Sequence, residues 1–333
     1  MQQPASLLPF TPPVWLGNRH LQSILPSLPL RRPATERRTR QLADASRELV
    51  LDCGEGVRLL ALHATQQRLG RRPARHLVVL HHGWEGSAES LYILSLGQAA
   101  LDAGFDVVRL NLRDHGQTHH LNRDLFHSCR IAEVVGAIRR LQELNPAQEI
   151  SLAGFSLGGN FALRVGARAG EARLRLRRIV AVCPVLDPVV TLGALEQGSP
   201  LYREYFLMKW RRSLRRKAEA WPGVYDFGSL LRERSLTTMT ARMVADYTDY
   251  PDLRTYLEGY AVTGDALASL ATPSRIITAL DDPMIPAGDL ARLSRVPALN
   301  VTVAARGGHC GFVDRLRGPS WIDREIVAEL SRD

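Results

Sequence analysis

The sequence predicts an α/β protein whose mostly parallel sheet is covered by helices on both faces. Two observations carry this prediction. Short apolar runs alternate with helical patterns from residue 46 onward, and the alternation stops between residues 187 and 263 before it resumes. The chain has 333 residues, 45% of them hydrophobic, which suffices for one large domain with an insertion or for two smaller domains. We expect a core formed by 46–186 and 264–333, with a helical cap inserted at 187–263.

The first segments of the chain lead into the core. Residues 1–45 are rich in proline and arginine and are expected to form an arm laid over the domain rather than a core element. The stretch 47–64 alternates around residues 53–56, which predicts a β-hairpin. The apolar run at 76–83 then predicts a strand that ends in a glycine turn.

The remaining core elements are predicted as alternating helices and strands. Helices are expected at 88–104, 125–145, 157–170, 287–296 and 320–332. Strands are expected at 105–116, 149–156, 176–186, 273–282 and 299–308. Parallel strands need crossover connections, so this alternation places helices on both faces of a parallel sheet.

Charge and cysteine content narrow the function classes. The formal net charge of +9 comes mostly from arginines spread along the chain, without a recognisable nucleic-acid module, so no nucleic-acid partner is expected. The four cysteines have no CxxC spacing and predict reduced thiols rather than a disulfide framework or a zinc site. The apolar stretches are too short for a membrane span and the N-terminus lacks a signal-peptide pattern, so we expect a cytoplasmic protein.

A serine lies between glycines at the end of a predicted strand. Residues 154–158, Gly-Phe-Ser-Leu-Gly, match the G-x-S-x-G pattern, in which the glycines relieve crowding in a sharp turn that projects the serine hydroxyl above the sheet. The pattern alone is weak, because it also arises by chance and would equally suit a structural glycine-rich corner. Its position between a strand and a helix favours Ser156 as a nucleophile.

An acid and a histidine follow the serine in the order that this architecture requires. Asp282 ends the predicted strand 273–282, and His309 lies in a glycine-flanked loop after the last strand. Both side chains leave the same edge of the sheet as Ser156. His309 is expected to take the serine proton, while a carboxylate fixes its tautomer and stabilises the imidazolium.

Three aspartates compete for the acid role. Asp282 is favoured because the proline that follows it fixes the turn that carries the side chain back to the histidine. Asp281 would then cap or brace the loop. Asp187, after an earlier strand, is the alternative if the cap is arranged differently.

Two backbone amides are expected to bind the oxyanion of an acyl-transfer reaction. One is the N–H of Leu157, and the other is the N–H of Trp84, in a loop where a His-Gly pair lets the backbone turn its amide inward. His81 and His82 of that loop lack a matching acidic or histidine cluster, so no metal is expected. The chain has no Walker loop and no G-x-G-x-x-G turn, so no cofactor is expected.

These residues, with several further motifs, resemble the α/β-hydrolases, and within them the YheT-like branch related to the mammalian abhydrolase-domain esterases and phospholipases. The branch-specific motifs are FTPPVWLGNRHLQSILP, HHGWEGS, NLRDHGQTHHLNRDLFHS and GHCGF. The resemblance implies an eight-stranded sheet, a triad of Ser156, Asp282 and His309, and hydrolysis of carboxylic esters, acylglycerols among them. Two features depart from it: LRDHG stands where a relative would often carry Arg-Gly, and the N-terminal membrane anchor of the mammalian relatives is absent.

The leading interpretation is a serine hydrolase that forms an acyl-enzyme on Ser156 and releases it with water activated by His309. Its substrate is expected to be a small-molecule ester or a lipid ester. Dehalogenases and epoxide hydrolases of the same scaffold carry an aspartate nucleophile, so the serine argues against them. A peptidase or an acyltransferase with the same triad, and a non-catalytic binding protein on a retained hydrolase fold, stay open.

One helical pattern in the predicted cap has an aromatic face and a basic face. Its apolar residues recur every four positions, at Tyr202, Phe206, Trp210 and Leu214. The basic residues that cover much of the rest are Arg203, Lys209, Arg211, Arg212, Arg215, Arg216 and Lys217. We expect the apolar face to pack on the sheet and the basic face to meet water. A weak peripheral contact of the basic face with an anionic membrane is the alternative.

Overall fold

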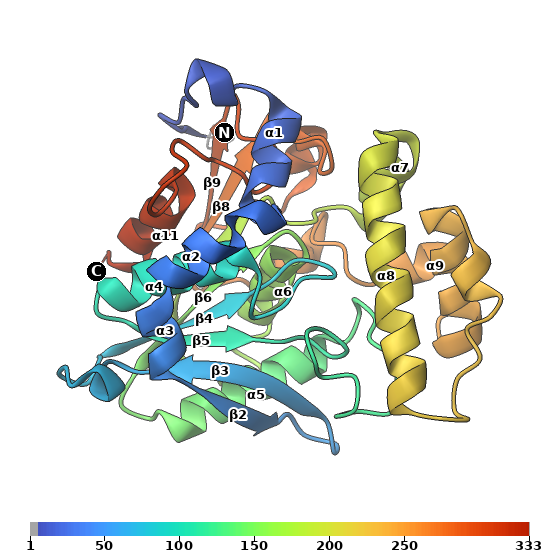
Figure 1. Cartoon of the computed structure of the whole chain (residues 1–333), viewed down its shortest axis with the longest axis horizontal. Helices are drawn as coiled ribbons and strands as arrows, with labels where there is room; N and C mark the ends of the chain where they lie inside the picture. Colours follow the sequence, from blue (N-terminus) through green and yellow to red (C-terminus); the bar gives the residue numbers. More distant parts are fainter. Residues whose placement is uncertain (1–5, 333) are drawn as a thin grey trace.

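The structure is a computed structural model that describes residues 6–332, and a nine-stranded sheet forms its centre (Figure 1). The strands are β1 (Ser6–Leu7), β2 (Ser46–Asp52), β3 (Arg58–Ala64), β4 (His76–His81), β5 (Asp106–Leu110), β6 (Glu149–Phe155), β7 (Leu176–Val182), β8 (Ser274–Ala279) and β9 (Leu299–Ala304). The helices are α1 (Arg19–Ile24), α2 (Arg32–Arg38), α3 (Arg40–Ala45), α4 (Leu91–Asp102), α5 (Ile131–Leu144), α6 (Leu157–Ala167), α7 (Pro188–Gln197), α8 (Pro200–Ala220), α9 (Leu236–Tyr247), α10 (Leu253–Glu258) and α11 (Trp321–Leu330). Short 3-10 turns connect several of these elements, and the turn Ala287–Arg292 stands where a short helix was expected.

The strand order is β1-β9-β8-β7-β6-β4-β5-β3-β2. Within the described residues, the strand pairs are parallel except at β3, which is antiparallel to both of its neighbours. The predicted hairpin is confirmed as β2 and β3, where Leu51 is buried while its neighbour Val50 is half exposed. The central parallel strands are buried on both faces, which explains why they read as apolar runs rather than as alternating patterns.

Helices cover both faces of the sheet, which confirms the predicted fold class. On one face, α4 packs on β4 and β5 and against α11, with α2 and α3 outside it. On the other face, α6 packs on β6 and β7 and against α5. Each face therefore has its own layer of buried apolar side chains against the sheet.

The N-terminal arm is part of the core, which corrects the prediction that it only lies over the domain. Its strand β1 pairs with β9, so the described sheet has one strand more than the resemblance implies. Phe10, Leu16 and Leu42 are at most 4% exposed. These apolar side chains are spaced among prolines and arginines, so composition alone did not identify the segment as a core element. Residues 1–5 of the arm lie outside the described part.

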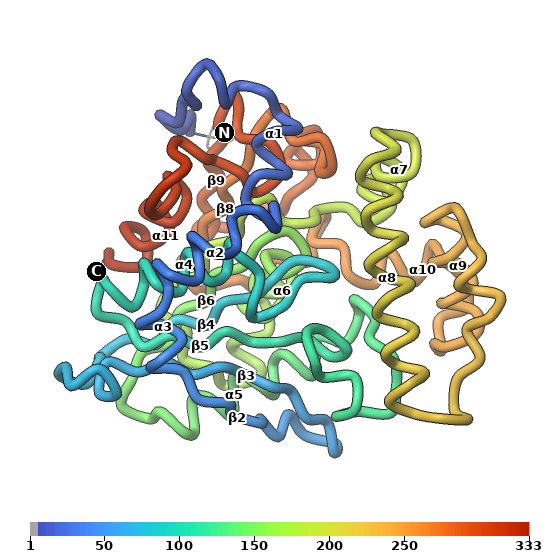
Figure 2. Tube along the Cα trace, in the orientation of Figure 1, coloured from blue at the N-terminus to red at the C-terminus, as the bar shows by residue number. Residues whose placement is uncertain are grey.

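Four helices, α7 to α10, lie between β7 and β8 in the chain and stand together on one side of the sheet (Figure 2). The longest, α8, turns its apolar face inward: Tyr202, Trp210 and Leu214 are buried, and Phe206 is half buried. No helix in the described range is both long enough and apolar enough to cross a membrane.

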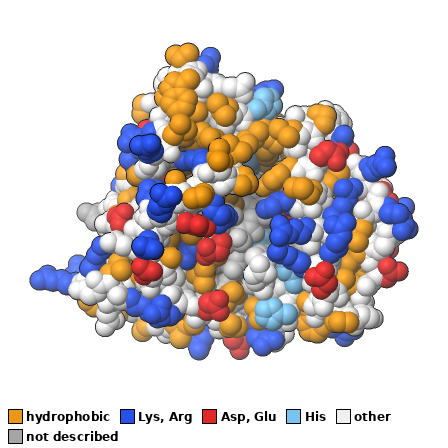
Figure 3. Space-filling view, in the orientation of Figure 1, with side chains coloured by type: hydrophobic (Ala, Val, Ile, Leu, Met, Phe, Trp, Pro, Cys, Tyr) orange, Lys and Arg blue, Asp and Glu red, His pale blue; other side chains and the backbone are white. Residues whose placement is uncertain are grey.

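The basic residues of α8 divide into an exposed and a buried group. Arg212 and Arg215 are exposed, and Figure 3 shows Lys and Arg side chains gathered over the α8 and α9 region. Lys217 is buried, which corrects its assignment to the water-facing side. Its ammonium donates to Asp114 Oδ1 at 2.8 Å and to the carbonyl oxygen of Asn122 at 2.6 Å. A buried ammonium needs such partners because its desolvation is costly.

Candidate active site

Ser156 lies at a strained turn between β6 and α6. Its φ of 54° and ψ of −121° fall in a region that residues with a side chain rarely adopt. The flanking glycines are required by close backbone approach. A Cβ on Gly154 would lie 2.3 Å from the carbonyl oxygen of Gly158, and one on Gly158 would lie 2.4 Å from the carbonyl oxygen of His81. The turn presents Ser156 to two cavities at the carboxyl edge of the sheet.

His309 and Asp282 reach the same edge from two other strands, β9 and β8. His309 Nδ1 lies 2.8 Å from Asp282 Oδ2. The other carboxylate oxygen accepts the N–H groups of Met284 at 2.8 Å and Ile285 at 3.0 Å. The Asp282 side chain is fully buried. These bonds hold the carboxylate where it can orient the imidazole ring.

Burial and two neighbouring groups act on the pKa of His309 in opposite directions. Burial by itself would lower the pKa of His309, but the Asp282 carboxylate and the Cys310 thiol raise it well above the usual 6.5. His309 Nε2 lies 3.7 Å from Cys310 Sγ. Among residues 6–332, no hydrogen bond joins the ring to Ser156, although both side chains line the same two cavities. Catalytic hydrogen bonds are often long in enzymes without substrate and shorten when substrate binds.

Two backbone amides near Ser156 are available to donate. The N–H of Leu157 is the first of helix α6 and has no acceptor within the helix. In the loop after β4, the amides on either side of Trp84 donate to Tyr92 Oη at 3.0 Å and to His115 Nε2 at 3.2 Å. The N–H of Trp84 itself has no acceptor in the part of the chain that the structure describes. The N–H groups of Trp84 and Leu157, the two expected oxyanion donors, thus make no other hydrogen bond within the described residues.

His81 ends β4 and His82 begins the loop after it, which carries Trp84; both histidines have structural surroundings. The N–H of Leu112 donates to His82 Nε2 at 3.2 Å, so Nδ1 carries the proton and donates to the carbonyl oxygen of Gly83 at 2.8 Å. Burial lowers the pKa of His82 well below its usual value and that of His81 to about 4. His82 is therefore neutral and anchors the loop that carries Trp84.

The two other candidate aspartates have partners of their own. Asp281 Oδ1 accepts the N–H groups of Gly307 and Gly308, each at 2.9 Å, and so braces the loop that carries the histidine. Asp187 accepts two amides at the start of α7 and pairs with Arg292. Within the described residues, only Asp282 of the three bonds to the imidazole.

Sequence reasoning missed the part of the N-terminal arm that holds the His309 loop. Ser23 Oγ accepts the N–H of His309 at 2.8 Å and donates to the carbonyl oxygen of Arg19 at 2.7 Å. The Gln22 amide, fully buried, both donates to and accepts from the backbone of Val313, at 2.9 and 2.8 Å. The only signal in the sequence was the motif FTPPVWLGNRHLQSILP. It supported the family resemblance but indicated no role for Gln22 or Ser23.

The LRDHG segment, residues 112–116, connects the loop after β4 with α8. Arg113 pairs with Glu133 at 2.6 Å and anchors the segment to α5. Asp114 accepts from Lys217, and His115 accepts the N–H of Glu85 in the loop after β4. Three consecutive side chains therefore connect three parts of the molecule.

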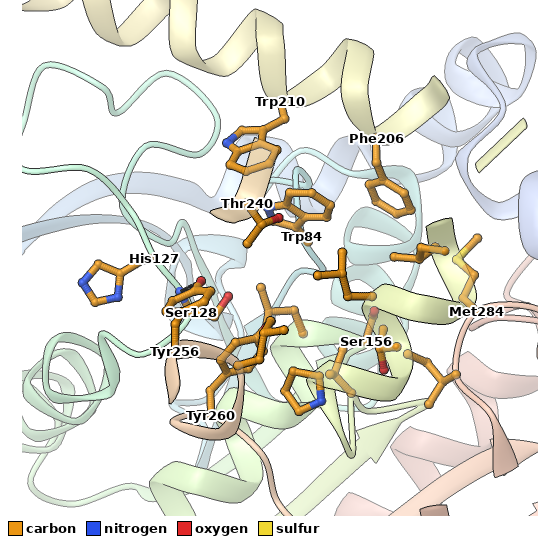
Figure 4. Close-up of a pocket in the computed structure, with 18 of the residues that line it drawn as sticks. Trp84, His127, Ser128, Ser156, Phe206, Trp210, Thr240, Tyr256, Tyr260 and Met284 are labelled. Atoms are coloured by element: carbon orange, nitrogen blue, oxygen red, sulfur yellow. Dashed lines mark hydrogen bonds between the residues drawn. The ribbon is translucent and has the colours of Figure 1, made fainter. Parts of the chain in front are cut away.

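The smaller of the two cavities has a volume of about 100 Å³ and is lined mostly by hydrophobic side chains (Figure 4). Phe206 and Trp210 project from α8 toward Trp84, with ring centroids 5.1 and 5.4 Å from that of Trp84. Ser156 and His309 also line this cavity. Its walls therefore come from the sheet edge and from the helices between β7 and β8.

The larger cavity, of about 420 Å³, opens onto the same serine and histidine from another side. It reaches the N-terminal arm and carries the charged side chains of Arg32, Glu85 and Lys209. Burial raises the pKa of Glu85 to about 7, in spite of the nearby Lys209 ammonium. The two cavities thus differ in size and in the charged side chains that line only the larger one.

Two of the four free cysteines lie beside His309. Cys183 follows β7 and is fully buried, and its Sγ accepts the N–H of Cys310 at 3.3 Å. The two residues are 127 positions apart. Their spacing in the sequence therefore does not predict this contact. It arises because β7 and β9 end at the same edge of the sheet.

Known proteins resemble this chain over most of its length. The family model for the alpha/beta hydrolase fold matches residues 76–316. YheT, a candidate esterase of Escherichia coli (strain K12), is 25% identical over 95% of this chain and 91% of its own length. The human protein ABHD15 is 24% identical over 96% of this chain and 68% of its own.

Solved structures with the same fold include two esterases. The Pyrococcus furiosus esterase Pf2001 aligns with a TM-score of 0.57 and 14% identity, over 88% of this chain and 95% of that one. The carboxylesterase CesB of Bacillus subtilis aligns with a TM-score of 0.52 and 16% identity, over 91% of this chain and 98% of that one. At such identities the likeness shows a shared fold.

Proposed function

The chain belongs to the α/β-hydrolase fold family, in its YheT-like branch, and we propose that it is a serine hydrolase that cleaves carboxylic esters. One observation carries the proposal. The ends of three strands bring together a serine at a strained turn, a histidine and a buried carboxylate bonded to that histidine at 2.8 Å. The names of YheT, Pf2001 and CesB support an esterase-like activity.

The proposed reaction begins at Ser156. His309 Nε2 accepts the hydroxyl proton as Oγ attacks the ester carbonyl carbon, and Asp282 stabilises the imidazolium that forms. The N–H groups of Trp84 and Leu157 donate to the oxyanion of the tetrahedral intermediate. When the intermediate collapses, the alcohol leaves with the proton from His309, and the acyl group stays on Ser156. His309 then deprotonates a water molecule, which attacks the acyl carbon and frees the acid.

The two cavities suggest how an ester would lie. We assign the acyl group to the small hydrophobic cavity of about 100 Å³, because an acyl chain offers nothing to bond with charged groups. The alcohol would then occupy the cavity of about 420 Å³, which carries Arg32, Glu85 and Lys209. The proposed substrate class is therefore an ester of a short acyl chain with a larger, partly polar alcohol.

Covalent labelling and turnover test the proposal together. A fluorophosphonate probe is expected to label the wild-type chain at Ser156, and Ser156→Ala is expected to lose both labelling and hydrolysis of p-nitrophenyl esters. Ser331→Ala removes an exposed hydroxyl at the end of α11, outside both cavities, and serves as the control that keeps both. Hydrolysis should fall as the acyl chain grows from acetyl to palmitoyl.

Each contrary result has its own meaning. Turnover by Ser156→Ala near the wild-type rate would refute the nucleophile. Labelling without ester hydrolysis would favour a peptidase or an acyltransferase with the same residues. A folded wild-type chain that takes no label would favour a non-catalytic binding protein.

A further inference from the structure

Three soft ligand atoms converge beside the proposed active site. Cys183 Sγ, Cys310 Sγ and a ring nitrogen of His309 all lie within 4.8 Å of one another. The carboxyl ends of β7 and β9 supply them, so the group is built by the sheet order rather than by a local motif. Two thiols and an imidazole form a donor set that suits Zn²⁺ and other thiophilic cations rather than Mg²⁺ or Ca²⁺.

The distances suit a tetrahedral ion. With Zn–S bonds of about 2.3 Å and Zn–N bonds of about 2.0 Å, neighbouring ligand atoms of a tetrahedral site lie about 3.5–3.8 Å apart. His309 Nε2 lies 3.7 Å from Cys310 Sγ. The N–H of Cys310 also donates to Cys183 Sγ at 3.3 Å, which holds the second sulfur toward the same point. Only small side-chain shifts would complete the three-ligand arrangement.

Asp282 supplies what a metal-binding histidine ordinarily needs. Histidines that ligate zinc usually donate their other ring N–H to a carboxylate, which fixes the ring and increases its basicity. Here Asp282 Oδ2 lies 2.8 Å from Nδ1, so Nε2 is left as the ligating atom on the side of Cys310. The same bond that orients His309 for catalysis therefore also prepares it for metal binding.

An ion could reach this point from solvent. Cys183 is fully buried, but His309 and Cys310 both line the cavity of about 420 Å³. The fourth position of a tetrahedral ion would face that cavity and hold water. Three protein ligands with one open position permit exchange of the ion, unlike a closed four-ligand structural site.

We propose that Cys183, His309 and Cys310 bind one Zn²⁺ ion reversibly and that the ion inhibits the hydrolase. Binding takes both sulfurs as thiolates and His309 with its Nε2 lone pair free, so it releases the protons that these three groups carry. That lone pair is the one that accepts the Ser156 proton in the proposed reaction, so metal binding and proton transfer exclude each other. The inhibitory part rests on the proposed function; the binding part does not.

Cadmium ions provide a direct test of binding. The full chain, kept reduced with a phosphine and free of chelators, is titrated with Cd²⁺ while the ultraviolet cadmium–thiolate charge-transfer absorption is recorded. We expect saturation at one equivalent, competition by Zn²⁺, and loss of the band in Cys310→Ala and in Cys183→Ala. Cys129→Ala removes a free thiol outside the cluster and should keep the full band.

Several results would overturn the site. These are a wild-type chain without the band, a band that survives in both Cys183→Ala and Cys310→Ala, and a band lost in Cys129→Ala. Cys183→Ala leaves a small hole in the core, so near-ultraviolet circular dichroism checks its fold. Cys310→Ala, at a partly exposed position, gives the same test independently.

Turnover distinguishes the site from the proposed function. For each variant, the ester hydrolysis rate with Zn²⁺ is divided by its own rate without Zn²⁺. We expect this ratio to be about 0.1 or lower, at least tenfold inhibition, in the wild type and in Cys129→Ala, and to stay near one in Cys310→Ala. Addition of a chelator should restore the rate of the two inhibited chains. A chain that binds Cd²⁺ but hydrolyses no ester refutes the function and keeps the site. An active chain that shows neither binding nor inhibition refutes the site and keeps the function.

Discussion

Two loops supply the proposed nucleophile and base; both contain glycines without room for a Cβ, but the His309 loop is also held by hydrogen bonds from distant side chains. The turn around Ser156 is held by its backbone: a Cβ on Gly154 or Gly158 would meet a backbone carbonyl oxygen, and Ser156 itself has a φ of 54°. The loop around His309 is held by side chains from distant segments, namely Ser23 of the arm, Asp281 after β8 and Cys183 after β7.

The difference lies in how each loop tolerates change. Backbone contact leaves no room for an added Cβ, so a single methyl group at the serine turn should displace a central strand. A loop held by several side-chain hydrogen bonds loses one bond at a time, and each is worth about 1 kcal/mol. Glycine substitutions in either loop should therefore act on the fold, whereas loss of one side-chain bond to the His309 loop should act on the rate.

The largest effect is expected from Gly158→Ala. Its Cβ would lie 2.4 Å from the carbonyl oxygen of His81 and 2.5 Å from that of His82, and a central strand cannot move away cheaply. We expect the free energy of unfolding, measured by urea denaturation, to fall by more than about 3 kcal/mol, at the upper end of overpacking costs.

Gly193→Ala is the matched control, because nothing lies within 4 Å of the added methyl group and the residue is inside helix α7. It should raise the free energy of unfolding by about 0.5–1 kcal/mol. Equal stability of the two variants would contradict the account of the serine turn.

The second-largest effect is expected from Asp282→Asn, and its comparison with Asp281→Asn tests which aspartate is the acid of the triad. Asp282→Asn removes the charge that fixes the His309 tautomer, and we expect kcat for ester hydrolysis to fall on the order of 10⁴-fold. Asp281→Asn keeps an acceptor oxygen for the amides of Gly307 and Gly308, so its kcat should fall less than about tenfold. Steady-state kinetics of both variants decides the assignment, and the opposite ranking would transfer the acid role to Asp281.

The smallest effect is expected from Ser23→Ala, which removes the acceptor for the His309 amide. Loss of one such bond, worth about 1 kcal/mol, should lower kcat about fivefold, while KM changes little. Ser331→Ala, which removes a hydroxyl bond at the far end of α11, is the comparison and should leave kcat unchanged. If Ser23→Ala raised KM alone, Ser23 would act on substrate binding rather than on the position of His309.

Much of the core could be predicted because its elements have strong local signals. The hairpin β2–β3 showed alternation around glycines, and the central strands read as apolar runs between helical patterns. The arm was misjudged because its buried residues, such as Phe10 and Leu42, are few and separated by prolines and arginines. Lys217 was assigned to the exposed face because helical periodicity cannot reveal that the Asp114 carboxylate lies on the buried side of α8 and accepts its ammonium.

The sequence by itself determined the order of the core elements, the G-x-S-x-G turn and the candidate residues Ser156, Asp282 and His309, because these depend on local patterns and on chain order. Only the tertiary structure decided that Ser23 supports the histidine loop, across 286 positions, and that Cys183 meets Cys310, across 127. Such contacts depend on which strands become neighbours in the sheet. That choice is made by the packing of all layers together, and no local stretch of residues encodes it.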